Sequence, residues 1–190
     1  MTIRYDTRSR VSTYTQSWVS GVNPDFGVFD SIATTTVGVT PVSEVIFSSI
    51  PQNYKHLHIR CSVRNSVTEG NFRIQFNSDT AANYSHHQLT ADGSSTASYP
   101  AANESYITAG NFTGVANVFT VNIIDVLNYT DTNIYKTTRS LQGFDRNGAG
   151  SVGFNSGNWR STSAITSIRL FAGNNAFAQY SSLALYGIKG

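Results

Sequence analysis

The chain has 190 residues, a length typical of one domain that can bury its own core. Charged residues make up 13% of the chain and the formal net charge is +2, which is too little positive charge for nucleic-acid binding by bulk electrostatics. The 12% aromatic content excludes a disordered chain, and the single cysteine excludes an internal disulfide or a multi-cysteine zinc site.

The first 25 residues differ in composition from the rest of the chain. They interleave arginines with large aromatic residues and show no strand-like alternation: Arg4, Tyr5, Arg8, Arg10, Tyr14 and Trp18. No apolar segment follows the arginines, so we predict no signal peptide and synthesis in the cytoplasm. Arginine and tyrosine are enriched at protein–protein interfaces. We therefore predict an N-terminal arm (residues 1–25) that binds a partner protein, followed by a single domain (residues 26–190).

Beyond the arm, apolar residues recur with a period of two, which is typical of β-strands. In residues 56–64, Leu57, Ile59, Cys61 and Val63 alternate with polar residues and predict a half-buried antiparallel strand. Similar patterns predict strands at 44–47, 72–76, 115–127, 135–144, 164–171 and 182–188, and weaker patterns predict them at 28–36, 84–89, 105–109 and 151–154.

Turn residues separate these segments. They include Asp92-Gly93, Tyr99-Pro100, Asn147-Gly148, Ser156-Gly157-Asn158 and Gly173-Asn174-Asn175. No segment has the periodicity of an amphipathic helix, and none is apolar over the length that a membrane helix needs. The spacing of strands and turns predicts an all-β, antiparallel β-sandwich, jelly-roll-like, behind the N-terminal extended arm.

Few residues fit a catalytic role. Asp125 is embedded in an apolar run, where its pKa could be raised, but an outward-facing residue paired with an arginine is the plainer interpretation. Cys61 lies on the inward face of its strand and is expected to pack in the core. We therefore predict no catalytic residues, and a protein that is not an enzyme.

Histidines and acidic turns offer weak candidates for metal binding. His56 and His58 share a strand face and His86 adjoins His87, but no acid or thiol completes a ligand set. The Asp145-to-Gly148 turn is similar to the start of a calcium loop, although no glutamate follows at the twelfth position. We predict no metal site and no cofactor.

Several motifs of the domain resemble small β-rich virion structural proteins of tailed bacteriophages. The resemblance covers roughly residues 28–190 and is carried by strand and turn patterns: Phe29–Ile32, Ile46–Pro51, Lys136–Leu141, Gly148-x-Gly150, Ser156–Trp159, Ala164–Leu170 and Gln179–Ile188. It implies a jelly-roll-like fold and a structural role in a virus particle. The resemblance does not distinguish a protein of the head from a protein of the tail.

Two functions follow as expectations. The first is a non-enzymatic capsid decoration protein, whose arm clamps major capsid subunits or other virion proteins. It would be made in the host cytoplasm, assembled onto the virion and homo-oligomeric, with a trimer favoured and no contact with nucleic acid or membrane. The alternative is a tail or fibre module that recognises a host surface glycan. Its shallow site would use aromatic and amide side chains of predicted loops: Tyr99, Asn147, Trp159 and Asn174.

Overall fold

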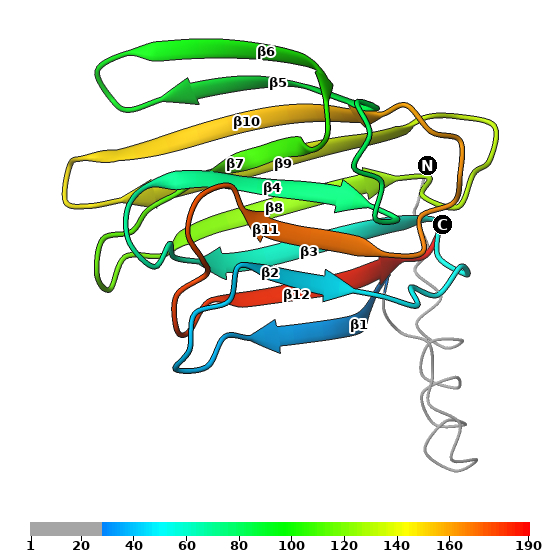
Figure 1. Cartoon of the computed structure of the whole chain (residues 1–190), viewed down its shortest axis with the longest axis horizontal. Coiled ribbons are helices and arrows are strands. Elements are labelled where there is room, and N and C mark those ends of the chain that lie inside the picture. The colour runs from blue at the N-terminus through cyan, green and yellow to red at the C-terminus, as the bar shows by residue number, and fades with distance from the viewer. Residues whose placement is uncertain (1–27) are drawn as a thin grey trace, which may run out of the picture.

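A computed structural model describes residues 28–190, so the predicted arm and its six interface residues lie outside the described part of the chain. Residues 28–190 form twelve strands and no helix (Figure 1). The strands are β1 (Phe29–Thr36), β2 (Glu44–Phe47), β3 (His56–Val63), β4 (Gly70–Phe76), β5 (Tyr84–Ala91), β6 (Thr96–Glu104), β7 (Ile107–Phe112), β8 (Thr120–Leu127), β9 (Lys136–Asp145), β10 (Gly150–Trp159), β11 (Ile168–Ala172) and β12 (Ser182–Ile188).

The strands form two antiparallel sheets that face each other, as the sequence pattern predicted. The larger sheet has eight strands in the order β1-β12-β3-β8-β9-β10-β5-β6, and the smaller has four in the order β2-β11-β4-β7. Eight of these strands form antiparallel pairs within their sheets: β1 pairs with β12, β2 with β11, β3 with β8 and β4 with β7. The chain thus alternates between sheets and pairs early strands with late ones, which is the arrangement of a jelly roll.

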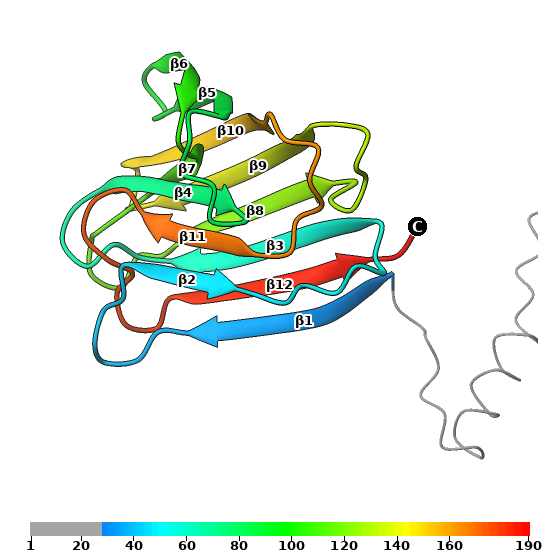
Figure 2. The ribbon, with the colours of Figure 1, turned by 45° about the vertical axis from the view of Figure 1, so that its right-hand side comes forward.

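Two hairpins are added to these four strand pairs, which form the core of the jelly roll. β5–β6 is inserted between β4 and β7, and β9–β10 is inserted between β8 and β11. Both join the larger sheet beyond β8, so that this sheet extends past the smaller one (Figures 1 and 2). The two hairpins carry the candidate site described below.

The core between the sheets combines aliphatic side chains with clusters of aromatic ones. Leu57, Ile59 and Ile124 are fully buried in the middle of the larger sheet. Towards the inserted hairpins, Trp159 stacks on Tyr84 with ring centroids 6.2 Å apart and also packs against Phe76. Burial of these side chains contributes about 1.5–3 kcal/mol each to the free energy of unfolding.

The structure corrects several predicted boundaries. Tyr99-Pro100 and Ser156-Gly157-Asn158 were predicted as turns but lie inside β6 and β10. Pro100 is tolerated because β6 is an edge strand, where a missing N–H breaks no ladder. Gly157 is required because a Cβ there would collide with Ile107 of β7. The predicted strand at 115–127 begins only at Thr120.

One buried cation holds the loops at one end of β9. The ammonium of Lys136 is fully buried and donates hydrogen bonds to the carbonyl oxygens of Asp131 (2.6 Å), Ile134 (2.9 Å) and Thr162 (3.1 Å). Burial lowers the pKa of this ammonium, and the nearby Asp131 carboxylate partly offsets that effect. Three acceptors use all three donors of the ammonium, so the charge is stabilised by hydrogen bonds.

We therefore expect Lys136→Met to lower the free energy of unfolding by roughly 2–4 kcal/mol, because methionine fills the space but leaves three carbonyl oxygens without their donor. Urea denaturation followed by circular dichroism measures the loss. Lys55→Met is the control, since Lys55 is exposed and its replacement should change stability by less than about 0.5 kcal/mol. Equal stability of the two variants would contradict a structural role for Lys136.

Candidate functional site

The inserted hairpins bury polar side chains on the inner face of the larger sheet. Asn122 of β8, Ser140 of β9 and Asn155 of β10 lie side by side and are nearly inaccessible. All three donate to a single acceptor, the carbonyl oxygen of Ala109 in β7, at 3.1, 2.7 and 3.3 Å. β7 can approach this closely because Gly110 follows, with φ +151° and side-chain atoms of Asn122 and Gln142 where a Cβ would stand.

The outer face of the same strands is apolar. Residues paired across antiparallel strands share a face, and one row across the sheet runs Leu89–Phe154–Leu141–Ile123. The next row runs Ala91–Val152–Gly143–Val121. Five side chains in these rows are between 47% and 59% exposed: Leu89, Val121, Leu141, Val152 and Phe154. These two rows are named the apolar face below.

The outer face of the smaller sheet shows the opposite and usual pattern. Arg169 pairs with Glu44 at 2.5 Å and donates to Gln75 at 2.7 Å. Arg73 lies over the ring of Tyr106, 4.0 Å from its centroid. Charged groups therefore lie across this face, and the contiguous apolar surface belongs to the inserted hairpins and the adjoining strand β8. A contiguous exposed apolar surface of this kind marks a binding site.

A groove follows β10 across the apolar face. It consists of three adjoining depressions of about 590, 180 and 410 Å³. The first and second share Ala91 and Val152, and the second and third share Leu89 and Phe154. The β5–β6 hairpin forms the outer wall of this groove. An apolar floor of this length can accommodate a protein surface or an elongated ligand.

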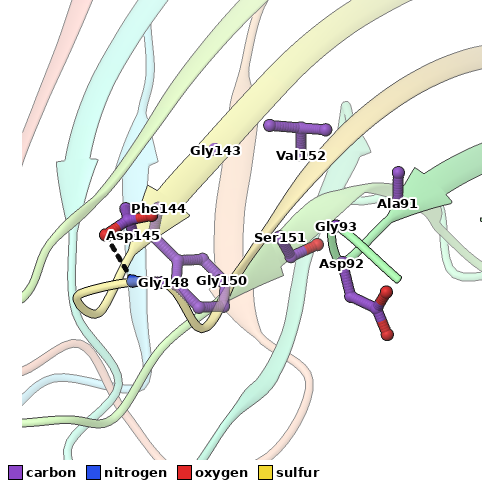
Figure 3. Close-up of a pocket in the computed structure, with 10 residues that line it drawn as sticks. All are labelled: Ala91, Asp92, Gly93, Gly143, Phe144, Asp145, Gly148, Gly150, Ser151 and Val152. Carbon is purple, nitrogen blue, oxygen red and sulfur yellow. Dashed lines mark hydrogen bonds between the residues drawn. The ribbon is translucent and has the colours of Figure 1, made fainter. Parts of the chain in front are cut away.

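Two aspartates mark one end of the groove, on the hairpin turns β5–β6 and β9–β10 (Figure 3). Asp92 accepts from the backbone N–H groups of Ser94 (2.8 Å) and Ser95 (2.7 Å), and these hydrogen bonds lower its pKa. Asp145 accepts from the N–H groups of Asn147 (2.7 Å) and Gly148 (3.3 Å). Both carboxylates therefore close turns while remaining exposed, and they give this end of the groove negative charge.

The other end of the apolar face carries an ion-paired cluster of one aspartate, one arginine and one histidine. The adjacent row runs His87–Ser156–Arg139–Asp125–His58. Asp125 accepts from Arg139 Nη2 at 2.7 Å and from His58 Nδ1 at 2.8 Å. Burial alone would raise the pKa of Asp125, but the hydrogen bonds from Arg139 and His58 outweigh it and hold the pKa below its usual range. Arg60 Nε donates to His58 Nε2 at 3.1 Å, so this His–Asp pair has no free ring nitrogen for proton transfer.

The four residues predicted for a glycan site do not come together. Trp159 is only 2% exposed and donates its indole N–H to Asp79 at 2.7 Å, so the expectation that it stacks on a sugar was wrong. Asn147 lies at the opposite end of β10 from Trp159, about 30 Å away at the usual rise per residue. Asn174 is exposed on a third loop, after β11. Tyr99 has 55% of its surface exposed, but it pairs with Gln88 of β5, so its side chain lies on the inner face of the sheet, opposite to the apolar face.

Other predicted features resolve into structural roles. Cys61 is buried, and burial raises the pKa of its thiol. Within residues 28–190 no group of three His, Cys, Asp or Glu side chains could hold a metal ion. No helix in this part of the chain could cross a membrane.

Comparison of the sequence with protein-family models and with curated proteins gives no match.

Sequence reasoning missed the apolar face itself. The alternation of Arg139, Leu141 and Gly143 with Thr138, Ser140 and Gln142 predicts a strand, but it does not identify the buried side. The available signal was the polarity of the residues between the apolar ones. Four of the five side chains that point inward from β9 are polar: Lys136, Thr138, Ser140 and Gln142.

We expect Asp125→Asn to lower the free energy of unfolding by about 1–2 kcal/mol at pH 7, since it removes charge-assisted hydrogen bonds to Arg139 and His58. A carboxylate whose folded-state pKa is lowered contributes stability above its unfolded pKa of about 3.9 and loses it as the pH falls through the folded pKa. The difference between wild type and variant should therefore shrink below about pH 4. Urea denaturation at pH 7 and pH 3 measures it, and a difference independent of pH would contradict this account.

Proposed function

We propose that this protein is a non-enzymatic structural component of a virus particle, a capsid decoration protein that works by protein–protein contact. The observation that supports this most directly is the apolar face. No other element of residues 28–190 covers the outer side of β5, β8, β9 and β10. Subunits of an assembly expose apolar surfaces that a neighbouring subunit covers, whereas monomeric proteins rarely expose a contiguous apolar surface.

Attachment to the particle is assigned to the N-terminal arm. Its arginines would pair with carboxylates of major capsid subunits and its aromatic side chains would fill pockets between them. A protein that binds the assembled shell and not free subunits stabilises the shell by mass action. The resemblance of residues 28–190 to phage virion proteins supports this location without distinguishing head from tail.

The test is the copy number of this chain in purified particles of the virus that encodes it, measured by quantitative mass spectrometry against the major capsid protein. We expect hundreds of copies, because only the head lattice offers that many equivalent sites. A few copies to a few dozen would place the protein on the tail and contradict decoration.

Deleting residues 1–20 should abolish attachment while the circular dichroism of the domain is unchanged. Particles still decorated by the truncated protein would contradict the arm's role.

A second candidate function is glycan recognition, favoured by the exposed aromatic ring on the edge strand β6. Tyr99 is 55% exposed and shares the inner face of the larger sheet with Gln88 of β5. An exposed tyrosine ring beside polar groups can stack on a sugar and hydrogen-bond to its hydroxyls. The site is shallow and contains no buried charged group.

If this edge of the sheet binds a host glycan, Tyr99→Ala should abolish binding on a glycan array. Trp159→Phe is the control, because it keeps an aromatic ring in the core and removes only the indole hydrogen bond to Asp79. We expect it to lower the melting temperature and leave binding intact. The absence of binding by the wild-type protein to host polysaccharide would reject this second function.

A further inference from the structure

We propose that the apolar face is a two-fold interface between two copies of this chain, packed face to face. This inference deepens the proposed structural role, since it names the neighbour that covers the face. Each copy would contribute the outer surface of β8, β9, β10 and β5, and the two larger sheets would stack as sheets do in a sandwich, about 10 Å apart. The composition, the charges and the size of this surface all favour such a contact.

The centre of the face is uncharged and can meet itself without repulsion. The two rows that contain Leu89, Phe154, Leu141, Val152 and Val121 hold no ionisable side chain between β5 and β8. The smaller sheet does not offer the same opportunity, because Arg169 and Arg73 of two copies would face each other there. Self-association through the larger sheet therefore requires less desolvation of charged side chains than self-association through the smaller sheet.

The ends of the face differ in charge: one carries two carboxylates, and the other carries the exposed guanidinium of Arg139 in its ion pair with Asp125. Arg139, with 63% of its side chain exposed, lies one row beyond Leu141, and Asp145 lies one row beyond Gly143 on the same strand. Asp92 lies beside Asp145, on the neighbouring turn. An inverted copy of this surface brings each exposed guanidinium opposite the carboxylates of its neighbour.

This charge pattern selects the direction of the two-fold axis. An axis across the strands, midway between Leu141 and Gly143, sets the row of Leu141 opposite the row of Val152. The same axis sets Arg139 of each copy opposite Asp145 of the other. An axis parallel to the strands would instead bring the acidic turns of both copies together. The geometry therefore selects the axis across the strands.

The size of the face is sufficient for a specific contact. The four strands of the face, β8, β9, β10 and β5, span about 19 Å at about 4.8 Å per strand. Eight residues along each strand span about 26 Å, which gives on the order of 500 Å² before side-chain relief is counted. Stable dimers bury about 800 Å² per partner, so the face and its charged rim are of the right order.

Sedimentation equilibrium of the full chain at micromolar concentration tests this interface. We expect a dimer, and we expect Leu141→Asp to raise its dissociation constant on the order of 100-fold, since a carboxylate would be buried at the centre of the contact. Ile46→Asp is the matched control: Ile46 is 54% exposed, also on a strand, but on the outer face of the smaller sheet. This variant should remain dimeric, and unchanged circular dichroism should show that both variants fold.

Cross-linking tests the register. A short bis-maleimide should link Arg139→Cys protein to Asp145→Cys protein in a mixture, and it should link neither variant to itself. Symmetric linking within one variant would overturn the proposed axis. A wild-type monomer, a trimer, or a dimer unaffected by Leu141→Asp would overturn the interface itself.

Dimerisation only after deletion of residues 1–20 would also overturn the proposal, because the chain's own N-terminal segment would then be the occupant. A monomer whose glycan binding is lost in Leu141→Asp would assign the face to a sugar. The copy-number measurement is independent of these results. A monomer that still decorates particles would refute the interface alone, and a dimer absent from the capsid would refute the decoration role alone.

Discussion

The carbonyl oxygen of Ala109 is the point on which the added half of the larger sheet is built. Donors from three neighbouring strands, on Asn122, Ser140 and Asn155, converge on it. Buried amides and hydroxyls are stable only where an acceptor reaches them, and β7 brings its backbone to them at Gly110. Because side chains alternate along a strand, the apolar residues of the same strands must face outward. The apolar face is thus a consequence of how β7 is held.

The alternation of apolar and polar residues was sufficient to predict the strands, but it was insufficient to predict which strands pair with each other. Glu44–Phe47 and Ser182–Ile188 were predicted with the observed bounds, because their apolar residues alternate between turn residues. The pairing of β1 with β12 joins residues about 150 positions apart, and no local pattern encodes it. The same limit applies to the apolar face, since alternation on β9 identifies two faces and only the position of β7 decides which one is buried.

The errors at the predicted glycan site have a common physical origin. Proline and glycine usually mark turns, and here Pro100 sits on an edge strand while Gly157 makes room for Ile107. Once these residues are strand residues, Tyr99 and Trp159 are no longer loop residues, and their exposure depends on what lies above each strand. β6 extends beyond the smaller sheet and leaves Tyr99 accessible, whereas Trp159 packs against Phe76 of β4. Residue type alone did not separate the two.

The edges of the larger sheet influence how the protein can associate. An open sheet can grow edge to edge, and that contact does not close, so it leads to fibres. Pro100 removes an N–H group from the edge strand β6 and opposes this mode of growth. A contact through the apolar face uses side chains and not strand edges, and a two-fold operator closes it after two copies. The two inserted hairpins therefore contribute buried side chains such as Trp159 and Lys136 on one face and, on the other, a surface that favours a closed assembly.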